Sequence, residues 1–318
     1  MKKLLALLII PLFLAVSCKK VEDNPTSETN SYKVMTTYMA SNNLDLNNVL
    51  TDWIVARPAA ADVPTFISSY DIFDLRDATA FGKGHIEGAT NVALANIVTE
   101  AAKTSKPILV VCYTGQTAAH GVVALKLSGY QAKVLKWGMS GWRADLSTPW
   151  EGNSGPANGV TAIGHTNWVT TATTTPAVFK TPDLTLSGDG AAMLKTRVNY
   201  MIGEGFKGIV NTEVLNNPSK YFINNFWDQA DVDHYGHIGE AYRIKPLTIS
   251  NKEMLGMDAS KTIVTYCWTG QTSSMVTAYL NVIGYNAVSL KFGTNGMIYT
   301  DLQSHKFVTP TVDLPVVQ

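Results

Sequence analysis

The chain contains one six-residue signature twice, and this duplication constrains its fold more than any other feature. Residues 112–117 read Cys-Tyr-Thr-Gly-Gln-Thr and residues 267–272 read Cys-Trp-Thr-Gly-Gln-Thr, so five of six positions agree at an offset of 155 residues. The same offset relates further pairs downstream: Gly129 and Gly284, Tyr130 and Tyr285, Lys136 and Lys291, Gly138 and Gly293, Gly141 and Gly296. A fixed offset indicates a duplicated domain. The length of 318 residues accommodates two domains of ordinary size.

The composition is that of a globular protein with hydrophobic cores. Hydrophobic residues make up 46% of the chain and charged residues 16%. The 25 basic residues balance the 25 acidic residues. With no basic surplus, we expect no nucleic-acid partner.

The N-terminus predicts export and a lipid anchor. Lys2 and Lys3 precede an apolar run, Leu4 to Val16, that is too short to span a bilayer, so residues 1–17 are interpreted as a signal peptide. The stretch 15–18, Ala-Val-Ser-Cys, is similar to a bacterial lipobox, which predicts lipidation of Cys18 and a polar tether over 18–30. The expected location is the bacterial cell envelope, anchored to a membrane and facing the periplasm or the surface. The alternative is a plain signal peptide with an incidental cysteine.

The first domain is expected over residues 31–150 as an α/β unit. Helices are predicted near 32–40, 46–55, 94–103 and 118–127, and strands over 70–75, 90–92, 108–111 and 134–135. The run 108–111 is continuously apolar, which is typical of a strand buried on both faces of a parallel sheet. Alternation of strands and helices predicts a parallel sheet with right-handed crossovers.

The second domain is expected over residues 186–318, after a connector over 151–185 that is rich in Gly, Asn, Thr and Pro. Helices are predicted over 191–202 and 273–283, and strands over 222–226, 262–266 and 288–290. The second domain therefore repeats the plan of the first.

Each repeat places a cysteine where a strand meets a helix. Backbone N–H groups of the loop and the positive end of the next helix favour a thiolate, or an anion attached to the sulfur. Gly115 and Gly270 allow the loop to turn its N–H groups inward, and Thr117 and Thr272 could donate hydroxyl hydrogen bonds to a terminal sulfur. A disulfide between the two cysteines is not expected, because they hold the same position in separate domains. An unpaired cysteine in an oxidising compartment indicates a working thiol.

These residues resemble the rhodanese (sulfurtransferase) family in both halves of the chain. The resemblance rests on the strand end Asp74-x-Arg76, the turn 84–89 that reads Gly-His-Ile-Glu-Gly-Ala, the cysteine loops, and the tail 129–142 with its Gly-Tyr and Lys-Trp-Gly elements. It implies a five-stranded, mainly parallel sheet per domain, flanked by helices. It also implies a two-step reaction in which a cysteine takes sulfane sulfur from a small donor, of the thiosulfate or 3-mercaptopyruvate type, and passes it to a thiophilic acceptor.

Carried over by position, the resemblance makes Cys112 and Cys267 the sulfur carriers and Arg76 a substrate-binding residue near the first pocket, with Asp74 as its ion-pair partner. The alternative is that Asp74 and Arg76 are only a structural pair that ties the strand to the loop. The implied substrate-binding residues of the two loops are Tyr113, Thr114, Gly115, Gln116 and Thr117, and Trp268, Thr269, Gly270, Gln271 and Thr272. No metal or other cofactor is implied.

The sequence also departs from the family pattern. Neither loop carries Arg or Lys, which argues against thiosulfate as the physiological donor. Ala118 and Ser273 stand where phosphatase relatives carry arginine, so phosphatase activity is not expected. In the second repeat, Asn225 and Trp227 align with Asp74 and Arg76, so the ion pair is absent there. The first domain is favoured as the better catalyst, because it alone retains Arg76 for anion binding.

Two alternatives to a sulfurtransferase remain. One is a non-catalytic sulfur-carrying or partner-binding module, and the other is a thiol redox protein. A cysteine in both loops favours transfer over binding, and the absence of a Cys-x-x-Cys pair disfavours redox exchange. His85 and His237 lie in matching turns, where a packed histidine bonded to the backbone is favoured over a metal ligand. Tyr113 and Trp268 either flank a pocket or cover the loop. The sequence does not indicate an oligomeric state.

Overall fold

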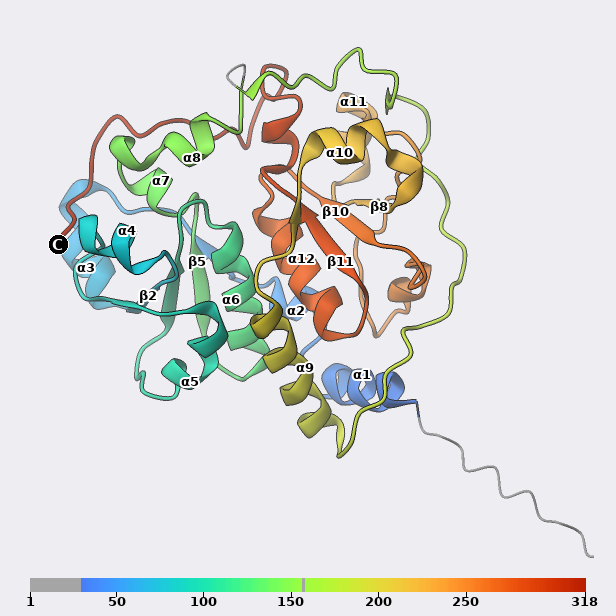
Figure 1. Cartoon of the computed structure of the whole chain (residues 1–318), viewed down its shortest axis with the longest axis horizontal. Coiled ribbons are helices and arrows are strands. Elements are labelled where there is room, and N and C mark those ends of the chain that lie inside the picture. The colour runs from blue at the N-terminus through green and yellow to red at the C-terminus, as the bar shows by residue number, and fades with distance from the viewer. Residues whose placement is uncertain (1–29, 156–157) are drawn as a thin grey trace, which may run out of the picture.

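The computed structural model describes residues 30–155 and 158–318 (Figure 1). The predicted signal peptide, the predicted lipidation site Cys18 and nearly all of the predicted tether lie outside the described residues. Among the helices that are described, none combines the length and apolar character needed to cross a membrane.

The first sheet has five parallel strands in the order β1-β5-β4-β2-β3 within the described part of the chain. Its strands are β1 (Ile54–Val55), β2 (Asp71–Asp74), β3 (Ala89–Asn91), β4 (Ile108–Val111) and β5 (Ala132–Leu135). All four residues of the central strand β4 are buried, as the apolar run predicted. The expected five-stranded parallel sheet is therefore present in the first domain.

The helix predicted over 46–55 is wrong in its second half. Helix α2 (Leu46–Val49) ends early, and the chain then forms the edge strand β1. Ile54 and Val55 pair with Val134 and Leu135 of β5, so tertiary pairing overrides the local helical pattern.

The second sheet contains four parallel strands among the residues described, in the order β7-β11-β10-β8. These are β7 (Gly208–Ile209), β8 (Phe222–Asn225), β10 (Ile263–Tyr266) and β11 (Ala287–Leu290). A bridge between Asn224 and Tyr242 stands where the expected fifth strand would lie. Just before this bridge, β9 (His237–Ile238) pairs antiparallel with β6 (Trp168–Val169) of the connector.

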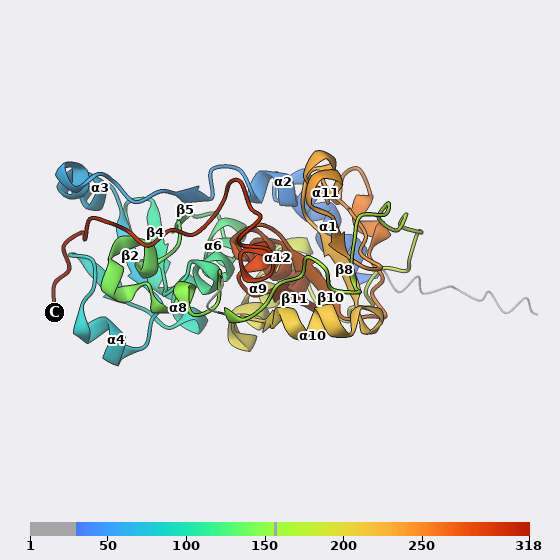
Figure 2. The same cartoon turned by 90° about the horizontal axis from the view of Figure 1, so that it is seen from above.

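Three helices lie between the two sheets. Figures 1 and 2 place α6 (Gln116–Leu127), α9 (Gly190–Glu204) and α12 (Gln271–Val282) at the centre of the molecule, and α6 packs directly against α12 and α9. Since α6 and α12 each follow a cysteine loop, their packing brings both loops to the boundary between the domains. The remaining α-helices are α1 (Ser31–Ser41), α3 (Val63–Ser68), α4 (Ala78–Lys83), α5 (Ile97–Ala101), α7 (Met139–Trp142), α8 (Thr148–Glu151), α10 (Asn211–Asn216) and α11 (Gln229–Tyr235).

The two ends of the described chain pack on the opposite domains. Helix α1 packs on α9, and its Tyr32 ring meets Tyr285 of the second repeat edge-on at 6.4 Å. The C-terminal segment returns to the first sheet, where Leu314 is buried and Val317 pairs with His85 (Figure 1). A segment of the expected first domain, 31–150, therefore packs on the second, and a segment of the expected second domain, 186–318, packs on the first.

Candidate active site

The first cysteine loop directs backbone amides at its sulfur. Cys112 follows β4 directly, and the loop turns at Gly115, whose φ of +81° lies in the left-handed region that favours glycine. The N–H of Gly115 donates to the Cys112 Sγ at 3.1 Å, and the N–H of Ala118 donates at 3.4 Å. The sequence had indicated such a cradle over residues 113–117. It missed Ala118, because a backbone donor leaves no side-chain signal, although the first turn of a helix always offers free N–H groups.

Burial acts against these amides. Cys112 is 4% exposed, and burial raises the pKa of its thiol. The N–H groups of Ala118, Thr114 and Gly115 lower the pKa, and the Asp74 carboxylate raises it, so that the balance lies above the ordinary thiol pKa. The loop amides therefore favour the thiolate, as expected, but burial, which the sequence does not reveal, outweighs them. The amides serve to offset the cost of forming the anion.

The second loop holds its sulfur with different groups. Cys267 follows β10, and Gly270 makes the same left-handed turn, with φ of +76°. The Cys267 Sγ accepts from the N–H of Ser273 at 3.3 Å and donates to the Ser273 hydroxyl at 3.6 Å. That hydroxyl lies 2.8 Å from the Ser289 hydroxyl. The second sulfur therefore contacts a pair of serines, whereas the first accepts from two backbone amides.

Two further expectations concern the cysteine sulfurs. Both Cys112 and Cys267 are free thiols in the described structure. Among the described residues, the two sulfurs accept from the N–H groups of Gly115, Ala118 and Ser273, and the Cys267 thiol donates to the Ser273 hydroxyl. Donation from Thr117 and Thr272 to a terminal sulfur stays a prediction.

Asp74 and Arg76 form a buried ion pair beside the first loop. The Arg76 Nη2 lies 2.6 Å from the Asp74 Oδ2, and both side chains are 1% exposed. The same Nη2 donates to the Gly84 carbonyl at 2.8 Å, while the guanidinium lies 5.8 Å from the centre of the Tyr113 ring. The pair thus ties the end of β2 to the turn before β3. Its contacts support the structural role over direct anion binding.

Aromatic rings occupy the equivalent region of the second domain. Trp227, which stands in place of Arg76, stacks on Trp268 at 4.2 Å, and His305 stacks on Trp268 at 5.0 Å. Within the described residues, the side chain of Asn225 and the indole N–H of Trp227 have no hydrogen-bond partner. Trp268 is therefore covered by two rings, whereas Tyr113 is 37% exposed and donates to Asp77 at 3.1 Å.

The structure also brings the two loops into contact, which the sequence did not predict. The side chain of Gln271 donates to the Thr114 carbonyl at 3.2 Å. The side chain of Gln116 accepts from the N–H of Phe292 at 2.9 Å. Repetition of glutamine at the same loop position was the available signal, but it did not reveal that each glutamine reaches the other domain.

The turn histidines contact backbone carbonyls. The His85 Nδ1 lies 3.1 Å from the Phe81 oxygen. The two ring nitrogens of His237 lie 2.7 Å from the oxygens of Ile238 and Thr171. Across residues 30–155 and 158–318, no group of three or more His, Cys, Asp or Glu residues is placed to hold a metal ion.

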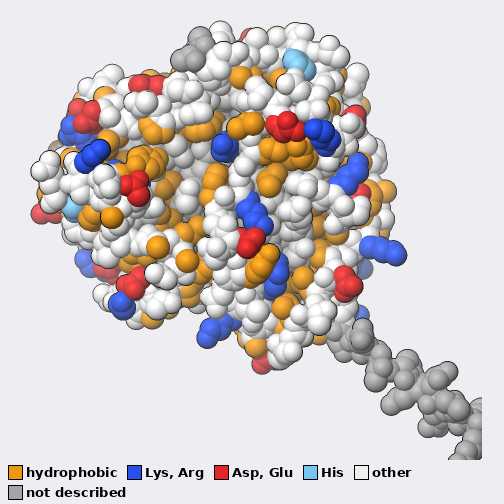
Figure 3. Space-filling view, viewed as in Figure 1, with side chains coloured by type: hydrophobic (Ala, Val, Ile, Leu, Met, Phe, Trp, Pro, Cys, Tyr) orange, Lys and Arg blue, Asp and Glu red, His pale blue; other side chains and the backbone are white. Residues whose placement is uncertain are grey.

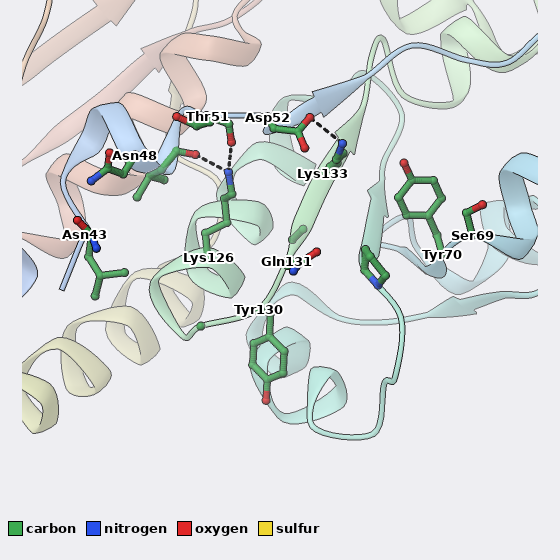
Figure 4. A pocket seen from close by; sticks show the side chains of 15 residues that line it. Asn43, Asn48, Thr51, Asp52, Ser69, Tyr70, Lys126, Tyr130, Gln131 and Lys133 are labelled. Carbon is green, nitrogen blue, oxygen red and sulfur yellow. Dashed lines mark hydrogen bonds and ion pairs between the residues drawn. The ribbon is translucent and has the colours of Figure 1, made fainter.

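A cavity of about 520 Å³ lies at the opposite end of the first sheet from Cys112 (Figure 4). Its lining includes Pro107 and Ala132, which stand at the starts of β4 and β5. Its two lysines are engaged: Lys126 donates to backbone carbonyls of Val49 and Thr51, and Lys133 pairs with Asp52 at 2.6 Å. Figure 3 shows basic and acidic side chains interspersed over the visible face. The cysteine loops therefore remain the candidate site.

Comparisons with known proteins point to the same loops. A model of the rhodanese-like domain matches residues 59–145 and 215–297, which together exceed half of the chain and include both cysteines. Thiosulfate sulfurtransferase GlpE of Shewanella oneidensis is 34% identical over 82 residues, which are 24% of this chain and 80% of that protein.

Solved structures are similar at lower identity. A rhodanese-related protein of Thermoplasma volcanium is 22% identical with a TM-score of 0.25, and the match covers 28% of this chain and 89% of that chain. A thiosulfate sulfurtransferase of Pseudomonas aeruginosa is 14% identical with a TM-score of 0.29, and the match covers 88% of this chain and 49% of that chain, about half its length.

Proposed function

The chain belongs to the rhodanese-like domain family, and from this we propose that it is a sulfurtransferase carrying sulfane sulfur as a cysteine persulfide. The observation that carries the proposal is the pair of N–H groups, from Gly115 and Ala118, that meet at the Cys112 sulfur. Such a cradle stabilises negative charge on that sulfur, or on a second sulfur bound to it.

The proposed reaction has two steps. The Cys112 thiolate attacks the transferable sulfur of a donor, which is the outer sulfur of thiosulfate or the thiol sulfur of 3-mercaptopyruvate. A sulfur–sulfur bond forms, and the donor's own bond to that sulfur breaks with its electron pair leaving as sulfite or as the enolate of pyruvate, which takes up a proton. A nucleophilic acceptor such as cyanide then attacks the terminal sulfur and releases the Cys112 thiolate. The amides offset the burial that raises the pKa of Cys112 in the first step. They hold the charge on the terminal sulfur between the two steps.

We propose that Cys112 turns over faster than Cys267. Two backbone amides face the first sulfur, whereas one amide and one hydroxyl contact the second. In the second loop, the Trp268 ring is also stacked against Trp227 and His305. Since neither loop carries a basic side chain and the Arg76 guanidinium is engaged by Asp74, a donor with one negative charge, such as 3-mercaptopyruvate, fits better than the dianion thiosulfate.

The test is thiocyanate formation from cyanide, with each donor, by the wild type, Cys112→Ser, Cys267→Ser and the double variant. We expect Cys112→Ser to lose at least about tenfold in kcat/KM, Cys267→Ser to retain most activity, and the double variant to be inactive. Matching unfolding curves exclude misfolding as the cause. Activity that survives in the double variant would reject the persulfide mechanism.

The covered second site supports a second candidate for that half alone. A Cys267 that carries sulfur without turning over would fit the stacked rings around Trp268. Mass spectrometry of the Cys267 peptide after donor treatment separates the cases. An added sulfur that cyanide does not remove indicates a carrier, and one that cyanide removes at the rate of turnover indicates a second catalyst.

A further inference from the structure

Each domain inserts a glutamine into the cysteine loop region of the other. Gln116 and Gln271 are the first residues of α6 and α12, and they are 3% and 1% exposed. A Cβ placed on Gly115 would lie 2.0 Å from the Gln271 Nε2, and a Cβ placed on Gly270 would lie 2.5 Å from the Gln116 Oε1. Each loop therefore needs glycine at this position, because the other domain's glutamine occupies the space that a side chain would take.

The contact of Gln271 acts on the peptide unit that faces the first sulfur. Its Nε2 donates to the carbonyl of Thr114 at 3.2 Å. The N–H of the same peptide unit belongs to Gly115 and donates to the Cys112 Sγ at 3.1 Å. Because a peptide unit is planar and its C=O and N–H point in opposite directions, fixing the carbonyl also fixes the direction of the N–H.

We infer that Gln271 of the second domain is a positioning residue for Cys112: it holds the Thr114–Gly115 peptide so that its N–H faces the sulfur. A hydrogen bond to the carbonyl also polarises the amide and strengthens the bond that its N–H donates. The indole of Trp150 supports the same carbonyl from the first domain at 3.3 Å. The first sulfur site is thus completed by a side chain from the second domain.

The arrangement is not reciprocal. The Gln116 side chain donates to the Thr114 hydroxyl of its own loop at 3.1 Å and accepts from the N–H of Phe292 at 2.9 Å. Among the described residues, the amide that contacts the Cys267 sulfur is that of Ser273, inside α12, and no glutamine supports it. A side chain of the second domain therefore supports an amide at the Cys112 sulfur, whereas no equivalent contact from the first domain supports the amide at the Cys267 sulfur.

The consequence for turnover rests on the proposed function, but the reactivity of the thiol can be measured without a sulfur donor. In the full chain, Gln271→Met keeps the side-chain length and removes the donor. The rate of iodoacetamide alkylation at Cys112 is followed from pH 6 to pH 10 by mass spectrometry of its peptide. We expect the profile to shift to higher pH and the rate near pH 7 to fall about three- to tenfold, the effect of one hydrogen bond.

Three further variants make the result specific. Trp150→Phe removes the second donor to the same carbonyl and should shift Cys112 in the same direction. Gln131→Met changes an exposed glutamine at the far end of the first sheet and should leave the profile unchanged. Gln271→Asn withdraws the amide from Thr114 by one methylene and should reproduce the shift, so it replaces the Met variant where that variant fails to fold.

An unchanged Cys112 profile in folded Gln271→Met or Gln271→Asn protein overturns the inference. So does an equal shift at Cys267, because that result indicates a general loosening between the domains. Failure of the proposed function is a different outcome: alkylation would respond to Gln271 as expected, while cyanide assays would show no transfer that depends on Cys112.

Discussion

At the scale of single residues, two glycines support the cysteine loops from behind. Gly138 and Gly293 occupy equivalent positions of the two repeats, with φ of +62° and +52°. A Cβ on Gly138 would lie 2.3 Å from the Cys112 carbonyl oxygen, and one on Gly293 would lie 2.2 Å from the Cys267 carbonyl oxygen. Both contacts are with backbone, which cannot move without moving the loop. Repetition of these glycines was visible in the sequence, and the structure supplies its reason.

We predict that Gly138→Ala displaces the first loop. The substitution combines a left-handed φ with a backbone collision, so it should lower the free energy of unfolding by about 1–3 kcal/mol. It should also cut transfer through Cys112 at least about tenfold, because the N–H of Met139 that donates to the Cys112 carbonyl shifts with it. Urea unfolding and the cyanide assay in a Cys267→Ser background measure both effects.

The matched control is Gly203→Ala in α9, where a Cβ meets nothing within 4 Å. This variant should keep full activity and gain up to about 1 kcal/mol in stability. Wild-type stability and transfer in Gly138→Ala would show that the loop tolerates displacement, and the proposed dependence on loop geometry would be wrong.

The local ion pair of the candidate site could be predicted from the sequence, whereas the pKa of its cysteine and its contact with the other domain could not. Asp74 and Arg76 stood two residues apart at a strand end, and they form the expected pair at 2.6 Å. The pKa of Cys112 depends on burial by residues far away in the sequence, and the contact between Gln271 and Thr114 joins two domains. Neither quantity is encoded in a local pattern.

At the scale of elements, strongly patterned segments agree with prediction, and so does the edge strand β3, predicted over 90–92 and found at Ala89–Asn91, whereas the two shortest edge strands were missed. The strand over 108–111 and the helices after each cysteine occur as expected, although α6 and α12 begin two residues earlier, at Gln116 and Gln271. The edge strands β1 and β7 have two residues each, which is too short for an alternating pattern. In place of the expected fifth strand of the second sheet, the described residues form a single bridge between Asn224 and Tyr242.

Helix α6 carries a buried histidine that makes the protein sensitive to acid. His120 is fully buried, has no hydrogen-bond partner among the described residues, and meets the Phe206 ring at 5.1 Å. Burial, aided by the charge of Lys207, lowers the pKa of His120 to about 3. Between this value and about pH 6.5, the imidazole of His120 binds a proton in the unfolded chain but stays neutral in the folded chain. His120 therefore makes the free energy of unfolding fall as the pH falls through this range.

We predict that in His120→Leu the free energy of unfolding falls less steeply with falling pH between about pH 6.5 and pH 3, because unfolding of the variant takes up one proton fewer. Urea unfolding of the two proteins at several pH values gives the difference directly, and acidic side chains common to both cancel. His165→Leu is the control, because that imidazole is partly exposed and bonds Asn216 at 3.2 Å. Parallel pH curves for wild type and His120→Leu would contradict the low pKa of His120.

At the scale of the whole molecule, the two repeats are joined by more than the connector. Duplication in the sequence predicted two α/β units, and both are present. It did not predict that α1 would pack against α9, or that the C-terminal segment would return to the first sheet. Packing between ends of the chain depends on which apolar faces remain uncovered once each unit has folded, so no local pattern announces it.

The C-terminal segment should therefore stabilise the first domain. Leu314 is fully buried with Trp142 and Leu135, and the Trp142 indole donates to the Pro315 carbonyl at 2.9 Å. Leu314→Ala removes buried methyl groups from this core and should lower the free energy of unfolding by about 2–5 kcal/mol. Hydrogen exchange should show the loss in β4 and β5 of the first sheet before β10 and β11 of the second. Val308→Ala, at a position that is 70% exposed, should change neither quantity.

Because α7 joins this core to the loop of Cys112 through Met139, alkylation of Cys112 should also accelerate in Leu314→Ala while that of Cys267 stays constant. Equal loss of protection in both sheets would instead mean that the segment stabilises the molecule as one cooperative unit.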